Sequence, residues 1–329
     1  MSEEFEEVEV YGFKRNIHSV KNYSLFETKS NISYKIIGTF EDGKYFNRFW
    51  NYLKLIVLLY SKHGLRKKHL YVVGIDLRMI SFFILNSKID YVISDIVWLY
   101  FKGIKKKIFK PIDLFLARTS NKVIFTSLGF YEAYYKNDVP KEKVVLNENL
   151  LATYGKVHPL ENLRSDGIHI AYIGAFRYGE IIDNLLNAVK KNKQLNLNFY
   201  GDGESEIVHT MKEYAEEYDR ITYNGAFKNP DDLQAIYEQN NINFVVYDNR
   251  LLNERVAMPN KFYESGFFNM PILCATNTYV GQRAVEQGMG WTCDIYEESI
   301  SEFFDSITIS ELIDCHNRIK TLDKSQFNY

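Results

Sequence analysis

The sequence predicts an α/β protein with two doubly wound domains, each built on a parallel β-sheet. Three observations lead to this prediction. Short apolar segments alternate with amphipathic segments of helical length along most of the 329-residue chain. Several of these apolar segments run directly into a glycine turn, as strands of parallel sheets often do. Residues 148–167 show no periodicity and divide the pattern into two halves. Strands that alternate with helices form right-handed βαβ units and parallel sheets, and a chain of this length holds two ordinary domains.

The first half contains short runs rich in Val, Ile, Phe and Tyr, which favour strands. These runs lie at 7–13, 70–75, 90–95, 122–126 and 143–147. Segments in which apolar residues recur with helical spacing predict helices between most of them. The predicted helices lie at 46–62, 77–87, 104–119 and 128–136.

The second half shows the same alternation more clearly. Apolar or alternating runs predict strands at 168–174, 195–203, 220–225, 242–248, 271–275 and 290–294. Helical periodicity predicts helices at 181–192, 205–218, 229–239, 260–268 and 280–288. The helix at 229–239 is expected to begin at the Asn-Pro pair that opens it. A last helix is expected around 309–322, with no strand after it.

Composition excludes several classes of protein. Hydrophobic residues make up 46% of the chain, which is enough for packed cores, so we do not expect intrinsic disorder. Cys274, Cys293 and Cys315 lie far apart, which excludes a metal-ligand spacing and fits a reducing compartment. The acidic N-terminus shows no signal-peptide pattern, and the longest apolar run, 53–60, is too short to span a membrane. We therefore expect a cytoplasmic protein.

Glycines and a cation follow two predicted strands of the second half. Ligands of parallel sheets bind beyond the carboxyl ends of the strands, so these positions are candidates for a binding site. Gly174 ends the strand at 168–174 and Arg177 follows it, and Gly201 and Gly203 lie at the end of the next strand. A glycine turn that leads into a helix binds anions, and arginine adds a bidentate phosphate donor. A single glycine would mark only a turn, whereas the set along one sheet edge favours a ligand.

The segment AMPNKFYESGFF, at 257–268, predicts a helix whose first turn carries a lysine. Pro259 fixes the approach to this helix, and Asn260 is expected to be its N-cap residue. Lys261 then lies where the helix dipole is already positive, which is unfavourable unless an anion binds there. Glu264 shares a helix face with Lys261. The pair offers a cation for a diphosphate and a carboxylate for ribose hydroxyls; the alternative is a capping arrangement with a solvated lysine.

These segments resemble bacterial glycosyltransferases of the GT-B fold, specifically the retaining, family-4-like group that builds surface polysaccharides. The resemblance is carried by IAYIGAFR, LNFYGDGE, ITYNGAF, LQAIYEQNNINFVVYD and PNKFYESGFFNMPILCA, all between residues 168 and 294. The block PNKFYE is its most specific part. Residues 90–135 also look like the N-terminal domain of that group, so the resemblance covers most of the chain.

The resemblance implies two Rossmann-like domains that face a cleft. An acceptor-side domain would span 1–147, a linker 148–167, and a domain that binds the nucleotide sugar 168–308. The final segment, 309–329, would cross back to the N-terminal domain. The activity implied is metal-independent hexosyl transfer, with retention, from a nucleotide-diphospho-sugar that we expect to carry UDP. The acceptor would be a saccharide or a lipid-linked saccharide.

Site residues can be carried over from that group onto this sequence. The resemblance implies that Arg177 and Lys261 bind the diphosphate and stabilise its charge as it leaves. It implies that Glu264 binds the ribose and that Phe227 presents its backbone to the base. Gly201 and Gly203 would keep the floor of the cleft open, and Gly174 is a further candidate for binding the donor.

Two features depart from that group. Many members have a glutamate eight positions before the ribose glutamate, where this chain has Val256. Contacts to the sugar are then expected from the backbone of neighbours such as Met258, Pro259 and Asn260. The chain also begins at the strand expected at 7–13, which resembles the second strand of that group. The N-terminal domain is therefore expected to lack the usual first strand and helix, or to be completed by a partner chain.

Two residues of the first half are candidates for orienting the acceptor hydroxyl. Asp95 ends the strand expected at 90–95, on the cleft side, and His18 is the second candidate, although a lone histidine is more often structural. Asp202 and Glu204 could form a metal-binding pair, but a Gly-Asp-Gly turn accounts for them. We expect no metal, because arginine and lysine supply the positive charge.

The first half is basic and the second half acidic. Lys and Arg outnumber Asp and Glu by 24 to 16 in residues 1–150, and are outnumbered by 26 to 16 in the rest. This imbalance indicates an anionic partner for the first half or arises by chance. Two basic, aromatic segments, 47–70 and 102–110, either lie on the inner face of an anionic membrane or form ordinary helices with solvated lysines. In the first case the expected acceptor is linked to polyprenyl diphosphate. No recognised nucleic-acid module accompanies these segments.

Two other functions fit parts of the sequence. The missing first strand and Val256 favour a non-catalytic GT-B-like chain that binds a partner glycosyltransferase. A homo-oligomer of this chain is a further alternative. A sugar-nucleotide epimerase would need acid and base residues around the sugar, and no obvious set is present. Hydrolysis of a nucleotide sugar by the purified chain separates an enzyme from a scaffold.

Overall fold

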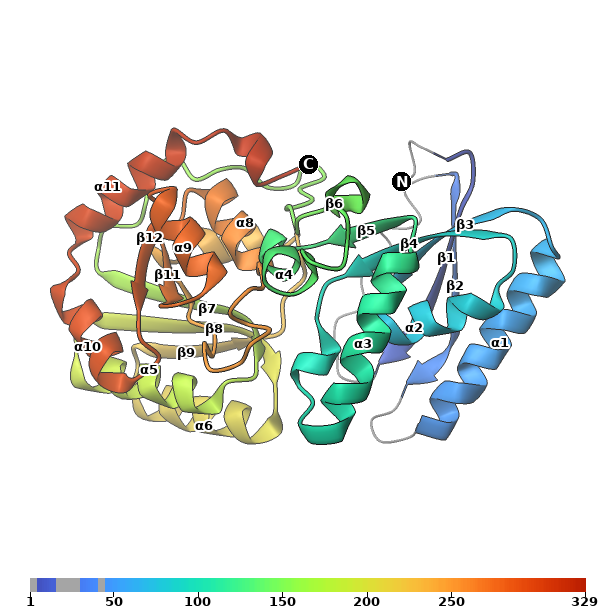
Figure 1. The fold of residues 1–329 in the computed structure, drawn as a ribbon. Coiled ribbons are helices and arrows are strands. Elements are labelled where there is room, and N and C mark those ends of the chain that lie inside the picture. Colours follow the sequence, from blue (N-terminus) through green and yellow to red (C-terminus); the bar gives the residue numbers. More distant parts are fainter. Residues whose placement is uncertain (1–4, 16–29, 41–44) are drawn as a thin grey trace.

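The computed structural model describes residues 5–15, 30–40 and 45–329. In this part of the chain all strands pair in parallel, and they form three sheets. Figure 1 shows the C-terminal domain at the left and the N-terminal domain at the right, each with helices packed on its sheet. The predicted α/β class, with parallel sheets in two domains, is confirmed.

The C-terminal domain contains one six-stranded sheet with the order β12-β11-β10-β7-β8-β9. The first strand, β7, therefore lies in the middle of the sheet. Strands β8 and β9 follow on one side of it, and β10, β11 and β12 lie on the other side. This is the order of a doubly wound sheet, in which right-handed crossovers place helices on both faces. Its elements are β7 (Ile168–Phe176), α5 (Gly179–Lys191), β8 (Leu195–Gly203), α6 (Ser205–Glu217), β9 (Ile221–Gly225), α7 (Leu233–Glu238), β10 (Ile242–Val245), α8 (Asn260–Phe268), β11 (Ile272–Ala275), α9 (Tyr279–Glu286), β12 (Gly290–Cys293), α10 (Glu297–Ser306) and α11 (Ile309–Lys320).

Burial explains why the sequence pattern of this domain is so regular. Every residue of β10 and β11 is buried, as expected for central strands that are covered on both faces. Helix α5 buries a stripe at helical spacing that includes Ile182, Leu185, Leu186 and Val189. The helix expected at 229–239 is shorter in the structure, because a turn precedes α7. Helix α10 is not among the predicted elements.

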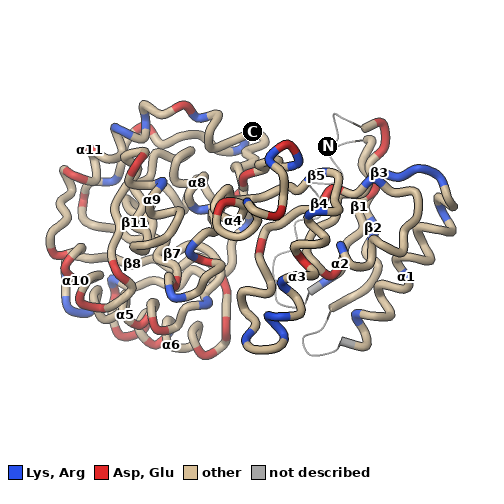
Figure 2. Tube along the Cα trace, in the orientation of Figure 1, with Lys and Arg blue, Asp and Glu red and all other residues tan. Residues whose placement is uncertain are grey.

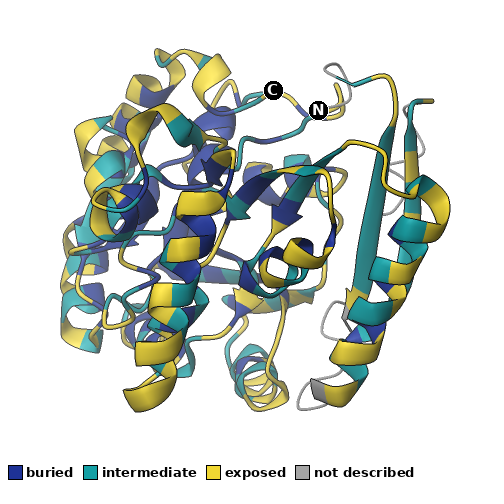
Figure 3. Cartoon of the chain, turned by 45° about the vertical axis from the view of Figure 1, so that its right-hand side comes forward, coloured by how far each residue is buried: buried dark blue, intermediate teal, exposed yellow. Residues whose placement is uncertain are grey.

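The N-terminal domain contains a four-stranded sheet, β3-β4-β5-β6, and a separate pair, β1-β2. Figure 3 shows β1 and β2 at intermediate burial, in contrast to the buried strands of the C-terminal domain. Its elements are β1 (Val8–Arg15), β2 (Ile32–Phe40), α1 (Tyr45–His63), β3 (Lys68–Val73), α2 (Ile75–Ile80), β4 (Ser87–Ile93), α3 (Gly103–Thr119), β5 (Lys122–Phe125), α4 (Leu128–Phe130) and β6 (Val144–Leu146).

Two details of this domain differ from the sequence prediction. Strand β2 is not among the predicted strands, and it pairs with β1 over eight positions from Val8↔Ile32 to Arg15↔Phe40. The chain itself therefore supplies the neighbour of β1, with no partner chain needed for this pair. The helix expected at 77–87 is split, because α2 ends at Ile80, a 3₁₀ turn follows, and β4 begins at Ser87.

A buried carboxylate organises the core of the N-terminal domain. Asp113 of α3 accepts hydrogen bonds from the hydroxyl of Tyr91 at 2.7 Å, from Trp98 Nε1 at 2.9 Å and from the hydroxyl of Tyr135. Burial raises the pKa of Asp113, while the three donors oppose that rise. The bonds join β4, the 3₁₀ turn at 97–99 and the helical segment after β5. They thereby hold the loop after β4, which carries Asp95.

The last helix does not cross to the N-terminal domain, contrary to what the resemblance implied for 309–329. Leu312, Cys315 and Ile319 of α11 are buried in the core of the C-terminal domain. The apolar face of α11 is therefore fully used there. At the end of this segment, the hydroxyl of Tyr329 lies 3.3 Å from Oδ1 of Asn147, the last residue expected in the other domain. Among the described helices, none has the length and apolar character needed to cross a membrane.

Candidate functional site

The glycines expected to form turns after two strands lie instead within the carboxyl ends of β7 and β8, where the two backbones touch. These strands pair as far as Gly174↔Gly201 and beyond. Gly201 has a φ of +147°, and a Cβ atom at this position would lie 1.8 Å from the carbonyl oxygen of Gly174. A Cβ atom on Gly203 would lie 2.3 Å from the carbonyl oxygen of Phe176. Only glycine allows the backbones to approach this closely. The backbone at these positions therefore carries no side chain, and we call this stretch of backbone the glycine floor of the site.

Helix α8 brings a buried ion pair to the same edge. Lys261 Nζ donates to both carboxylate oxygens of Glu264, at 2.8 and 2.6 Å, and the two side chains are 12% and 2% exposed. Asn229 Nδ2 donates to Glu264 Oε1 at 3.3 Å, and the hydroxyl of Tyr237 donates to Oε2 at 3.1 Å. Each carboxylate oxygen therefore has two donors, which fixes Glu264 in place.

Lys261 connects this pair to the glycine floor and to the loop after β9. A Cβ atom on Gly174 would lie 3.8 Å from Lys261 Cε. Lys261 Nζ lies 5.4 Å from the centre of the Phe227 ring, a cation–π distance. Phe227 thus contacts the lysine with its ring, a contact that the sequence did not indicate. Gly174, Gly201 and Phe227, from three separate βα units, therefore lie together with the Lys261–Glu264 pair of α8.

Asn260 is not the N-cap of α8. The helix begins at Asn260, and Pro259 stands before it in an extended conformation with φ −77° and ψ 152°. No side chain caps this end, and Asn260 is exposed. Proline suits the boundary position, because its fixed φ leads into the helix and its nitrogen has no hydrogen to satisfy. The alternative of a solvated lysine is also wrong, since Lys261 is largely buried and bonded to Glu264.

A pocket of about 430 Å³ opens where the strand order of the C-terminal sheet reverses. Strands β7 and β10 are neighbours in the sheet, and the loops after these two strands line most of the pocket. This is the point at which doubly wound sheets bind their ligands. The side chains that line it include Arg177, Tyr178, Glu180, Arg250 and Glu254, together with Tyr100 from the N-terminal domain.

Arg177 lies on the pocket side of this edge. Its side chain is exposed and makes no hydrogen bond or ion pair with any residue that the structure describes. Burial raises the pKa of Tyr247, the charge of Arg177 opposes that rise, and the charge of Glu264 adds to it. Arg177 and Glu264 are therefore both within electrostatic reach of Tyr247. The structure places Arg177 and Lys261 at the same sheet edge, although Lys261 does not line the pocket.

Asp95 lies at the boundary between the domains. Asn253, in the loop between β10 and α8, donates from Nδ2 to Asp95 Oδ1 at 3.1 Å. Asn253 Oδ1 accepts from the backbone nitrogen of Ile96 at 2.9 Å. The candidate acceptor residue Asp95 thus belongs to a contact that holds the two domains together beside the pocket. The other acceptor candidate, His18, lies outside the described residues.

We expect Asn253→Ala to lower the free energy of unfolding by about 2–3 kcal/mol, because it leaves the buried amide of Ile96 without an acceptor. Urea titration followed by tyrosine and tryptophan fluorescence measures this change. Asn249→Ala is the matched control, since Asn249 belongs to the same loop but bonds within its own domain, to the carbonyl of Thr276. The control is expected to lose about 1 kcal/mol. Equal losses in the two variants would contradict the interdomain role of Asn253.

Sequence reasoning missed Glu254, which lies in the same loop. Glu254 Oε1 accepts from the hydroxyls of Tyr100 at 3.2 Å and Tyr178 at 3.4 Å. Its Oε2 is buried and has no partner among the described residues, and the whole residue is 7% exposed. Burial raises the pKa of Glu254, and the charge of Asp95 adds to the rise. A sequence signal existed, because Glu254 follows the strand β10 within a loop rich in polar residues.

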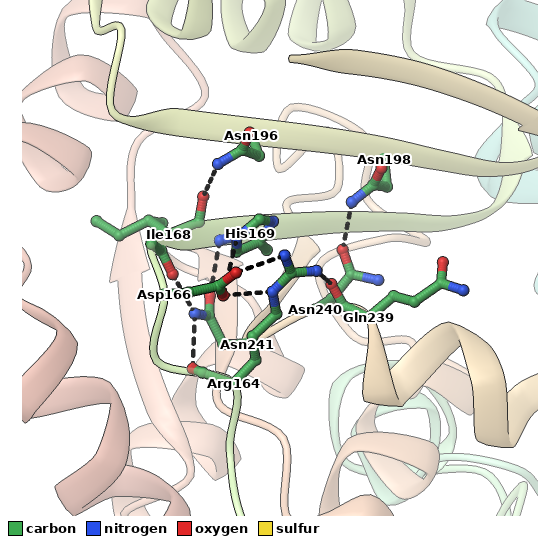
Figure 4. Close-up of polar contacts among 10 residues, drawn as sticks. Arg164, Asp166, Ile168, His169, Asn196, Asn198, Gln239, Asn240 and Asn241 are labelled. Atoms are coloured by element: carbon green, nitrogen blue, oxygen red, sulfur yellow. Dashed lines mark hydrogen bonds and ion pairs between the residues drawn. The ribbon is translucent and has the colours of Figure 1, made fainter. Parts of the chain in front are cut away.

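A second polar cluster lies at the opposite, amino edge of the C-terminal sheet (Figure 4). Asn241 Oδ1 accepts from the backbone nitrogen of His169 at 2.8 Å, and its Nδ2 donates to the carbonyls of Arg164 and Gly167. Asn198 Nδ2 donates to the side chain of Asn240 at 2.9 Å. These bonds fasten the loops that precede β7 and β10, so we assign the cluster a structural role.

No protein-family model and no curated protein sequence matches the chain. Solved structures do match it. Sucrose-phosphate synthase from Thermosynechococcus elongatus aligns with a TM-score of 0.70 and 13% identity, over 97% of this chain and 85% of that one. Anabaena HepE in complex with UDP and glucose aligns with a TM-score of 0.67 and 12% identity, over 96% and 89%. A glycosyltransferase from Rickettsia africae aligns with a TM-score of 0.65 and 12% identity, over 98% and 95%.

The chain shares the fold of these proteins. The GT-B arrangement that the sequence implied is therefore confirmed as a fold. At this level of identity the likeness concerns the fold alone, and function has to be argued from the residues of the site.

Proposed function

We propose that this protein is a glycosyltransferase that moves a sugar from a UDP-linked donor to a saccharide acceptor. The observation that carries the proposal is the meeting of a bare glycine floor, the Lys261–Glu264 pair and the exposed Arg177 at one sheet edge. This edge lies at the reversal of strand order, where a nucleotide diphosphate is expected. The match to Anabaena HepE in complex with UDP and glucose supports the choice of donor.

In this proposal the diphosphate lies over the backbone of Gly174 and Gly201. The ammonium of Lys261 has three N–H donors, of which Glu264 takes two, so one donor can reach a phosphate oxygen. Arg177 adds a bidentate donor from the other side. Both cations lie where negative charge develops when the bond between the sugar and the diphosphate breaks. They supply the charge that a metal would supply, so the proposal needs no metal.

Glu264 is proposed to bind the ribose hydroxyls. Its four acceptor positions are already taken by Lys261, Asn229 and Tyr237. Ribose hydroxyls must therefore replace one of these donors, and Lys261 is the one that a phosphate can attract away. Binding of donor would then exchange the lysine–glutamate bond for a lysine–phosphate bond and a glutamate–ribose bond.

The new bond between sugar and acceptor oxygen forms as the proton leaves the acceptor hydroxyl and UDP takes the electron pair. Retention at the sugar follows from the resemblance and is part of the proposal.

The acceptor is proposed to bind on the N-terminal side, near Asp95. Figure 2 shows lysines along α3 and acidic residues along α5, α6 and α10. Helix α1 has no acidic residue, and it exposes Phe46, Trp50 and Val57. On α3, Ile104 and Ile108 are exposed. The lysines between and beside them are Lys105, Lys106, Lys107 and Lys110. This mixture supports an acceptor linked to polyprenyl diphosphate, presented at an anionic membrane surface, as in the synthesis of a surface polysaccharide.

A panel of nucleotides and nucleotide sugars, scored by thermal stabilisation of the purified protein, tests the proposal. UDP or a UDP-sugar at about 100 times its Kd is expected to add about 2.7 kcal/mol of stability, whereas ADP and GDP are not. Release of UDP from the stabilising donor then distinguishes an enzyme from a non-catalytic chain, and a changed sugar on intact UDP would indicate an epimerase. Absence of stabilisation by every member of the panel would overturn the proposal.

A further inference from the structure

Glu254 lines the pocket, and its neighbours in the described part of the chain donate hydrogen bonds to only one of its two carboxylate oxygens. One oxygen, Oε1, faces the hydroxyls of Tyr100 and Tyr178. The other, Oε2, is buried and unpartnered in the described part of the chain. Leaving a buried carboxylate oxygen without a donor is costly, and such groups in folded proteins usually meet a partner that is not part of the chain.

The groups around Glu254 limit what that partner can be. Tyr100 and Asp95 face it from the N-terminal domain, and Tyr178 and Arg177 face it from the end of β7. An anion would be repelled by Glu254 and Asp95. A metal ion is disfavoured, because Arg177 lines the same pocket and no group of three or more possible metal-binding side chains occurs among the described residues.

The rest of the wall is polar. Arg250 is bonded to Asp248 at 2.8 Å and to Glu180 at 2.7 Å, so one guanidinium is shared by two carboxylates, and the three side chains present both donors and acceptors with a net negative charge. Hydroxyl groups, which donate and accept at once, match such a wall better than a base or a phosphate does. A volume of about 430 Å³ is within the range of small-ligand pockets.

We propose that Glu254 binds hydroxyls of the sugar that is transferred, which donate to its free Oε2. This inference rests on the proposed function. If Arg177 binds the diphosphate, a sugar attached to that diphosphate reaches the pocket that Arg177 lines. Glu254 then supplies, from two positions earlier in the same loop, the carboxylate that Val256 does not provide. Because Tyr100 and Asp95 come from the other domain, the sugar subsite is completed only when the two domains are in contact.

Calorimetry of UDP and of UDP-glucose with the full chain tests this inference. The variants are Glu254→Ala and Glu254→Gln, and Glu216→Gln is the control, because Glu216 is exposed on α6 and remote from the pocket. If another UDP-sugar stabilises the wild-type protein more, it replaces UDP-glucose. Both Glu254 variants are expected to weaken UDP-sugar binding about 10- to 100-fold and to leave UDP binding within about threefold. The melting temperature of Glu254→Gln without ligand is expected to be unchanged or higher, since a buried unpaired carboxylate is removed.

Two results would overturn the inference while the proposed function stands. One is an equal loss of affinity for UDP and UDP-sugar, which would assign Glu254 a structural role. The other is unchanged affinity for the UDP-sugar in both variants. If the wild-type protein binds neither UDP nor any UDP-sugar, the proposed function itself fails, and the inference fails with it.

Discussion

Lys261→Ala and Glu264→Ala are each expected to abolish measurable UDP binding, with a loss of about 100-fold or more in affinity. Removing Lys261 takes away a phosphate donor and leaves Glu264, which is 2% exposed, to repel the diphosphate. Removing Glu264 takes away the ribose acceptor and the group that holds the lysine beside Gly174. Calorimetry with UDP measures both effects.

Two controls separate this loss from damage to the fold. Glu264→Gln keeps the shape of the side chain and removes its charge, and it is expected to bind UDP as poorly as the alanine variant. Lys193→Ala removes an exposed lysine in the turn after α5 and is expected to bind UDP normally. Circular dichroism and melting curves show whether each variant is folded. Unchanged UDP affinity in both the Lys261 and the Glu264 variants would remove the site assignment.

The Lys261–Glu264 pair could be predicted because it lies within one helix turn. Its residues are three apart, so helical spacing alone brings them together, and proline before them marks where the helix starts. The helix was predicted with its correct bounds, 260–268, whereas its N-cap residue was predicted one position late, at Asn260 instead of Pro259. Glu254 could not be assigned in this way. Its partners Tyr100 and Tyr178 are 154 and 76 positions away in the sequence, and no local pattern brings them to one pocket.

The burial of each strand helps to explain which strands could be predicted from the sequence. Strands β10 and β11 are short and buried along their whole length, so their apolar runs stand out. Strand β2 is only partly buried along most of its length and belongs to a two-stranded sheet. Its sequence, ISYKIIGTF, alternates between apolar and polar residues only as far as Ile36, and it contains no continuous apolar run. Burial on both faces makes a strand stand out in the sequence; β1, which lacks such burial, was still predicted from its run of Val, Tyr and Phe, whereas β2 was not.

Asn253 and Glu254 link the contact between the domains to the proposed sugar subsite. They are neighbours in one loop, and Asn253 bonds to Asp95 and Ile96 while Glu254 meets Tyr100. A change in the distance between the domains would therefore move both groups together. If an acceptor binds on the N-terminal side, as proposed, this contact is a route by which it would change the pocket on the C-terminal side.

Gly201→Ala is expected to lower the free energy of unfolding by more than about 4 kcal/mol and to abolish UDP binding. The added Cβ atom would lie 1.8 Å from the carbonyl oxygen of Gly174, and both atoms belong to paired strands whose backbones cannot shift independently. The φ of +147° at Gly201 adds strain for any residue with a side chain. Urea titration gives the stability, and calorimetry of the folded fraction gives the affinity for UDP.

Gly155→Ala is the matched control, because Gly155 also has a positive φ, +72°, but no atom lies within 4 Å of the position of its Cβ. This variant is expected to lose only about 1–2 kcal/mol, the cost of the left-handed conformation alone, and to bind UDP normally. The difference between the two variants measures the close approach of β7 and β8. If Gly201→Ala lost no more stability than Gly155→Ala and still bound UDP, the floor of the site would not require bare backbone, and the path proposed for the diphosphate would be wrong.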